Sequence, residues 1–127
     1  ELRIEGHQSK TGKGRTIAFN DGPKEQAPFN AALAAWLSAC KDRPFHPVNF
    51  NRKFDAVRKL AGLAAWPEDV MRHTSISHYF RLTGSYGRTA EMFGNSEGII
   101  KQHYQSRVTS ADTARFYAIA PMKGNSL

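Results

Sequence analysis

The sequence predicts a mainly α-helical fold with a small β-hairpin at its N-terminus. Apolar residues recur at spacings of three and four over most of the chain, which is the period of helices that bury one face. Near the start, polar and apolar residues alternate in two short runs, which is the period of half-buried strands. The length of 127 residues suits one domain with a modest core.

The hairpin is expected from two alternating runs, Glu1–Glu5 and Arg15–Phe19. The segment between them, Gly6–Gly14, is rich in Gly, Ser, Lys and Thr, which is typical of a turn. Lys10 and Lys13 therefore lie at or near the tip of the hairpin. Taken alone, such a basic turn is most often a solvated surface segment.

Two helices should follow, each after a polar connector that contains two prolines. The first is predicted from Phe29 to Lys41 and the second from Asn49 to Leu63. The predicted buried faces are formed by Leu33, Trp36, Leu37 and Cys40 in the first helix, and by Phe50, Phe54, Val57 and Leu60 or Ala61 in the second. Basic residues on the second helix, Arg52, Lys53, Arg58 and Lys59, are interpreted as a solvated face, with contacts to a DNA backbone as the less common alternative.

A third helix is expected to begin at Pro67, because proline suits the first helical position and Glu68 and Asp69 suit the positive end of the helix dipole. Arg72 is the first residue on one face of this helix, and the apolar residues Ile76, Tyr79 and Phe80 follow on the same face. A buried guanidinium must find an anion. That anion is either a protein carboxylate or a phosphate, whose oxygens the planar fork of arginine matches.

The remaining elements are shorter. They are predicted in this order: a turn at Gly84–Gly87, a helix at Arg88–Phe93, a helix capped by Asn95 or Ser96 that carries Ile100, His103 and Tyr104, a helix at Ala111–Ile119 that begins after Thr109 or Ser110, and a frayed tail at 122–127.

Charge and composition restrict the classes of function that the sequence allows. The net charge of +7 favours an anionic partner, with nucleic acid as the leading candidate. Cys40 is the single cysteine, so an internal disulfide is excluded and a reducing, cytoplasmic compartment is expected. No apolar run of about 18 residues and no signal-like start occur, so we expect neither a membrane span nor secretion.

The motifs of the second half resemble those of the tyrosine recombinases, the phage integrase family. The second catalytic motif of that family is His-x-x-Arg, usually continued by His-Thr, and Arg72–Thr74 matches its last three positions. The third motif is Leu-Gly-His-Ser, with the nucleophilic tyrosine nine residues past the histidine; Gly94–Ser96 and Tyr104 follow that spacing. The chain departs from the family at Asp69, where the first histidine is usual, and at Asn95, where histidine or tryptophan is usual.

The resemblance implies a recombinase-like catalytic domain, truncated at the N-terminus, over residues 1–121, followed by the tail at 122–127. It implies site-specific DNA cleavage and rejoining through a 3′-phosphotyrosyl link, with no metal and no small-molecule cofactor. The first catalytic arginine and the DNA-clamping domain of the family precede the region matched here. We therefore expect this fragment alone to be inactive, and the full-length protein to act as a homo-oligomer on DNA.

The resemblance also assigns roles to residues. Tyr104 would be the nucleophile, Arg72 would clamp the phosphate, and Lys10 would protonate the leaving 5′ oxygen, with Lys13 in reserve. Asn95 would donate a hydrogen bond to the phosphate, and Asp69 would orient Arg72 or accept a proton. Further contacts to DNA are expected from Lys13, Arg15, His73 and His103.

Each of these residues also has an ordinary structural interpretation. Asp69 suits a capping carboxylate at a helix start, and His73 and His103 suit packed, hydrogen-bonded histidines. Tyr104 suits a half-buried helical tyrosine. Two alternative functions follow: a non-catalytic DNA-binding or interaction module that retains the recombinase fold, and a basic helical protein without a nucleic-acid partner.

Overall fold

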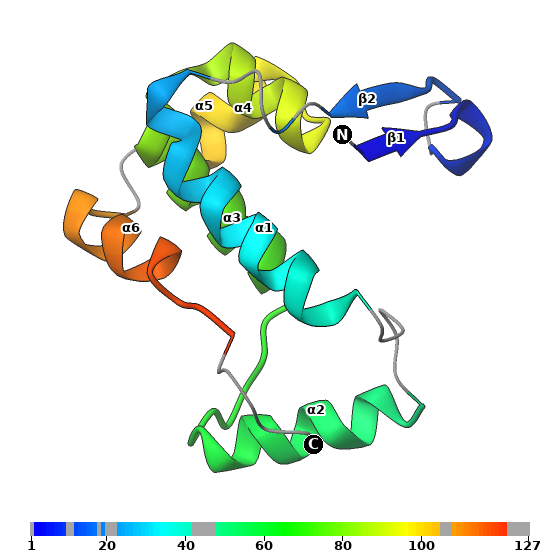
Figure 1. Cartoon of the computed structure of the whole chain (residues 1–127), viewed down its shortest axis with the longest axis vertical. Coiled ribbons are helices and arrows are strands. Elements are labelled where there is room, and N and C mark those ends of the chain that lie inside the picture. Colours follow the sequence, from blue (N-terminus) through cyan, green and yellow to red (C-terminus); the bar gives the residue numbers. More distant parts are fainter. Residues whose placement is uncertain are drawn as a thin grey trace.

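The computed structural model describes residues 2–9, 12–17, 19, 23–41, 48–104 and 108–121. Over these residues the chain forms six α-helices, one antiparallel pair of strands and two short 3-10 turns (Figure 1). In chain order the helices and strands are β1 (Leu2–Ile4), β2 (Arg15–Ile17), α1 (Ala27–Cys40), α2 (Phe50–Leu60), α3 (Val70–Thr83), α4 (Tyr86–Phe93), α5 (Glu97–Tyr104) and α6 (Ser110–Tyr117). The prediction of a mainly helical fold with a small hairpin is confirmed.

The hairpin pairs β1 with β2 in antiparallel register, with Arg3 opposite Thr16 and Ile4 opposite Arg15. After β1 the chain forms a 3-10 turn at Gly6–Gln8. A side chain at position 6 would lie 2.7 Å from the carbonyl oxygen of Gly12, so this turn requires glycine. Figure 1 shows the hairpin beside the end of the helical body where α4 and α5 lie.

Helix α3 is the element against which the other C-terminal helices pack. Its Ile76 is fully buried and joins Ala90 of α4 with Ile100 and Tyr104 of α5 in one apolar cluster. Half-buried aromatic residues, Phe80, Tyr86 and Phe93, pack against this cluster. The predicted inward position on the third helix is therefore confirmed at Ile76.

The predicted start of this helix at Pro67 is wrong, because α3 begins at Val70. The Pro67 carbonyl instead accepts a hydrogen bond from the Val70 amide at 3.3 Å, which closes a turn before the helix. Asp69 lies within that turn with a left-handed φ of 54° and stands at the N-cap of α3. Its side chain makes no capping hydrogen bond.

A second group of contacts attaches α1 and α6 to α3. The Tyr79 hydroxyl donates to Oε1 of Gln26 at 2.7 Å, and both side chains are buried. The ring of Phe29 meets Tyr79 edge-on at 5.2 Å. On α6, the Phe116 ring stacks on His78 at 4.2 Å. These contacts hold the N-terminal end of α1 and the whole of α6 against one helix.

The predicted buried faces of α1 and α2 are wrong. Neither helix contains a fully buried residue. Trp36 on α1 is 44% exposed and Leu60 on α2 is 88% exposed. The aromatic face of α2 packs mainly on itself and on the following connector, with Phe54 stacked on Phe50 and meeting Trp66 edge-on. In Figure 1, α2 stands apart from the body formed by α3–α6, which explains this exposure.

Among the helices formed by the described residues, none has the length and apolar character needed to cross a membrane.

Candidate functional site

The two predicted motifs meet at the turn between α4 and α5. Nη2 of Arg72 donates to the carbonyl oxygen of Phe93 at 2.8 Å and to Oδ1 of Asn95 at 2.7 Å. Gly94 makes this turn, because it ends α4 in a left-handed conformation with φ of 70°. The hydroxyl of Ser96 then accepts a hydrogen bond from the Ile99 amide and caps α5, as predicted.

The expectation that Arg72 is buried is wrong, because Arg72 is exposed. Its hydrogen-bond partners among the described residues are neutral oxygens and not a carboxylate, so the phosphate alternative stays a prediction. The ion pairs among the described residues join Arg3 to Glu5 and Arg58 to Asp55. The charge of Arg72 therefore has no carboxylate partner within the described part of the chain.

Tyr104 is paired with the residue that follows Arg72. Its hydroxyl lies 2.7 Å from Nδ1 of His73, and the two rings stack with centroids 5.4 Å apart. When Nε2 of His73 carries the ring proton, Nδ1 accepts a hydrogen bond from the phenol. Tyr104 is only 4% exposed, whereas His73 lies at the surface. The histidine is thus positioned both to hold the phenol and to take its proton.

Arg15 approaches the same turn from the hairpin. A Cβ placed on Gly94 would clash with the Arg15 guanidinium, with its Cζ only 2.6 Å away. The guanidinium of Arg15 therefore lies against the bare Cα of Gly94, one residue from Asn95. Residues from β2, α3 and the α4–α5 turn consequently gather in one place.

The other predicted site residues lie around this centre in different ways. The ring of His103 is exposed and meets Tyr104 edge-on at 6.4 Å. Lys13 is exposed between the 3-10 turn of the hairpin and β2. Asp69 is an exposed N-cap residue whose carbonyl accepts a hydrogen bond from the His73 amide. Lys10 lies outside the described residues.

Two features of this site were missed from the sequence. His73 was assigned to DNA contacts, and no spacing rule in the sequence pairs it with Tyr104, thirty-one residues away. The position of Arg15 against Gly94 depends on where the hairpin docks, which local patterns do not report. The one available signal was that His73 follows Arg72 directly in the same motif.

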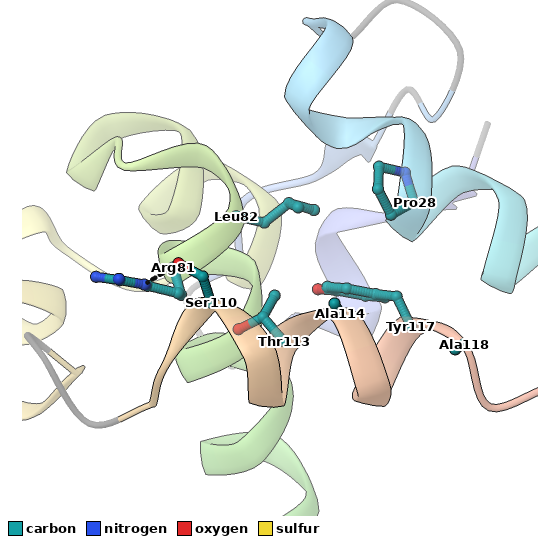
Figure 2. A pocket seen from close by; sticks show the side chains of 8 residues that line it. All are labelled: Pro28, Arg81, Leu82, Ser110, Thr113, Ala114, Tyr117 and Ala118. Atoms are coloured by element: carbon teal, nitrogen blue, oxygen red, sulfur yellow. Dashed lines mark hydrogen bonds between the residues drawn. The ribbon is translucent and has the colours of Figure 1, made fainter.

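A separate open pocket of about 500 Å³ lies between α1, α3 and α6 (Figure 2). Its walls include Leu82, Pro28 and the ring of Tyr117, and Nε of Arg81 donates to the hydroxyl of Ser110 at its edge. Figure 2 shows the Arg81 guanidinium extending away from the Tyr117 ring. Burial raises the pKa of Tyr117, so its phenol stays protonated. None of the predicted site residues that the structure describes lines this pocket.

The described ranges contain no group of three or more His, Cys, Asp or Glu side chains arranged to hold a metal ion. Comparisons with protein-family models, with curated proteins and with solved structures gave no significant match.

Proposed function

We propose that this chain carries the phosphate-clamping and nucleophilic residues of a tyrosine-type site-specific DNA recombinase or integrase. The observation that supports the proposal is the pairing of Tyr104 with His73 at 2.7 Å, together with the pairing of Arg72, the residue before His73, with Asn95. Phosphoryl transfer uses a nucleophile in hydrogen-bond contact with a base and a guanidinium that can bind the phosphate, and Arg72 has no carboxylate partner among the described residues. The net charge of +7 fits a DNA substrate.

The chemistry follows from these side chains. A phenol is a poor nucleophile at neutral pH because it holds its proton up to about pH 10. Nδ1 of His73 takes that proton while the Tyr104 oxygen forms a bond to phosphorus. Arg72 stabilises the negative charge on the non-bridging oxygens. The bond from phosphorus to the 5′ oxygen breaks, and that oxygen receives a proton from Lys10, the donor that the resemblance implies.

Asn95 has a defined part in this scheme. Because its Oδ1 accepts a hydrogen bond from Arg72, its amide N–H groups face other partners and can donate to a phosphate oxygen. Asn95 therefore both fixes the guanidinium and offers a neutral donor. Asp69 would act indirectly, through the backbone at the start of the helix that carries Arg72.

One observation favours the second candidate, a non-catalytic DNA-binding or interaction module. Tyr104 is 4% exposed and belongs to the same apolar cluster as Ile76 and Ile100. In such a module the hydrogen bond to His73 would serve only to satisfy a buried hydroxyl. Catalysis instead requires the phenol oxygen to reach a phosphate at the surface.

The test uses a pool of short random-sequence duplexes, each with one 5′-bridging phosphorothiolate. Its thiolate leaving group needs no proton, so the assay does not depend on Lys10. A covalent adduct at Tyr104, mapped by mass spectrometry, is expected in the longer protein that the resemblance implies. Tyr104→Phe should abolish the adduct. Tyr86→Phe, which alters a half-buried tyrosine packed against the same cluster, should retain it.

The outcomes separate the candidates. DNA binding that weakens with salt, with no adduct in any form of the protein, would establish the non-catalytic module. A DNA shift that is absent or insensitive to salt would remove the nucleic-acid partner altogether.

A further inference from the structure

Two guanidinium groups converge on the turn formed by Phe93, Gly94 and Asn95. Arg72 reaches it from α3 by hydrogen bonds to the residues on either side of Gly94. Arg15 reaches it from β2 and lies against Gly94 itself. Two like charges held close together without a carboxylate partner among the described residues repel each other, and an anion between them removes that penalty.

Arg72 alone cannot offer a complete fork to such an anion. Nη2 carries two N–H groups, and these already serve Phe93 and Asn95. Each two-donor edge of a guanidinium includes Nη2, so only single hydrogen bonds from Nε and Nη1 remain. A tight anion site at this turn therefore needs donors from a second residue.

We propose that Arg15 is that second residue, and that Arg15 and Arg72 form a clamp that holds one phosphodiester over Gly94. The choice of a phosphodiester as ligand rests on the proposed function. Arg15 would touch the substrate directly, and the amide of Asn95 would supply a third donor. Glycine at position 94 leaves the space that the Arg15 guanidinium occupies, and its φ of 70° is a conformation that residues with a side chain rarely adopt.

Covalent geometry places the two guanidiniums within reach of one ligand. Both contact backbone atoms of adjacent residues, so Nη1 of Arg15 and Nη2 of Arg72 lie within about 9 Å of each other. A phosphate that accepts hydrogen bonds of about 2.8 Å on two oxygens joins nitrogens up to about 8 Å apart. A small movement of either long side chain closes the difference.

The experiment titrates the 127-residue chain with dimethyl phosphate, a diester monoanion that cannot be cleaved under these conditions. The Nε–Hε NMR signals of Arg15 and Arg72 should shift with one common Kd, and that of Arg3 should not move. Arg15→Gln should weaken binding by roughly tenfold, because a charge-assisted donor is lost. Arg15→Lys should weaken it less, since the charge remains while the planar fork is lost.

Arg3→Gln is the matched control, because Arg3 stands on the partner strand and already pairs with Glu5. It makes the same change in net charge and should alter the affinity by less than about twofold. The inference is overturned if the Arg15 signal stays still while that of Arg72 shifts, if Arg15→Gln behaves like Arg3→Gln, or if no binding occurs. Because no bond is cleaved here, failure of the phosphotyrosyl chemistry would leave these results unchanged. Conversely, a DNA adduct at Tyr104 with unaltered phosphate binding in Arg15→Gln would overturn only the clamp.

Discussion

The pairing of His73 with Tyr104 predicts an asymmetric response to mutation. His73→Ala removes the acceptor that the Tyr104 hydroxyl uses in a site that is only 4% exposed. Tyr104→Phe removes the donor and leaves Nδ1 of a surface histidine, which water can reach. The first change should therefore be the more damaging one, although both break the same hydrogen bond.

The sizes of these two effects on the free energy of unfolding follow from the cost of removing a hydrogen-bond partner from a polar group. Removing the acceptor of a buried hydroxyl costs about 1–3 kcal/mol, whereas a hydrogen bond lost between groups that can be rehydrated costs about 0.5–1.5 kcal/mol. In the Tyr104→Phe background, His73→Ala should cost much less, because the hydroxyl that uses this acceptor is then absent. The coupling free energy between the two sites should be about 1 kcal/mol.

Urea unfolding followed by circular dichroism measures these free energies of unfolding. His103→Ala is the control, because this exposed histidine flanks the Tyr104 ring from α5 and carries the same gain in helix propensity. It should change stability by less than about 0.5 kcal/mol. Equal effects of His73→Ala and His103→Ala, or additive effects of His73→Ala and Tyr104→Phe, would refute the hydrogen bond and with it the proposed base.

Three further predictions concern the rest of the fold. Tyr79→Phe should lower the free energy of unfolding in urea by about 1–3 kcal/mol, because it removes the hydrogen-bond donor to Oε1 of the buried Gln26. A loss of stability no greater than that of Tyr86→Phe would contradict this prediction. Burial lowers the pKa of His78 below its usual 6.5, and the attraction of Asp112 opposes this shift. The contribution of His78 to stability is therefore complete above about pH 6.5 and is lost as the pH falls further. Unfolding at about pH 7.5 and about pH 5.5 should show this loss, and His78→Gln should reduce it; an unchanged pH dependence in the variant would exclude His78 as its source. Thr109→Ala should destabilise α6 by about 1 kcal/mol through loss of its capping box with Asp112, whereas an unaltered unfolding midpoint would show that the cap contributes nothing.

Local patterns predicted the helices and the hairpin because capping, turn residues and periodicity act over a few residues. Ser96 and Thr109, each one of two residues predicted at its helix start, cap α5 and α6, and Ile76 is buried as its spacing predicted. Periodicity failed for α2 because it reports which face is apolar but not whether another element covers that face. Phe50 and Leu60 lie on such a face and remain exposed.

The candidate site was likewise predictable from the sequence only in part. The motif identified Arg72, Asn95 and Tyr104 as one group, and the structure joins Arg72 to Asn95 at the α4–α5 turn and Tyr104 to His73, the neighbour of Arg72. The partners of these residues were not predictable, since they depend on the docking of separate elements. The left-handed conformation of Gly94 is explained by the turn that ends α4. It therefore does not indicate that Arg15 will lie against this residue.

The proposed catalysis would require free energy to expose the Tyr104 side chain, which is buried in the structure. Removing a large aromatic side chain from a core costs about 3–5 kcal/mol, so lifting the Tyr104 ring completely out would leave roughly one molecule in a thousand competent and slow the reaction by that factor. Tyr104 is the last residue of α5, however, and the final turn of a helix frays easily. Ile100, one turn earlier and fully buried, keeps the remainder of α5 in place. A phosphate held by Arg72 and Arg15 would favour the opened form in proportion to its greater affinity for that form, so substrate binding itself would raise the fraction of exposed nucleophile.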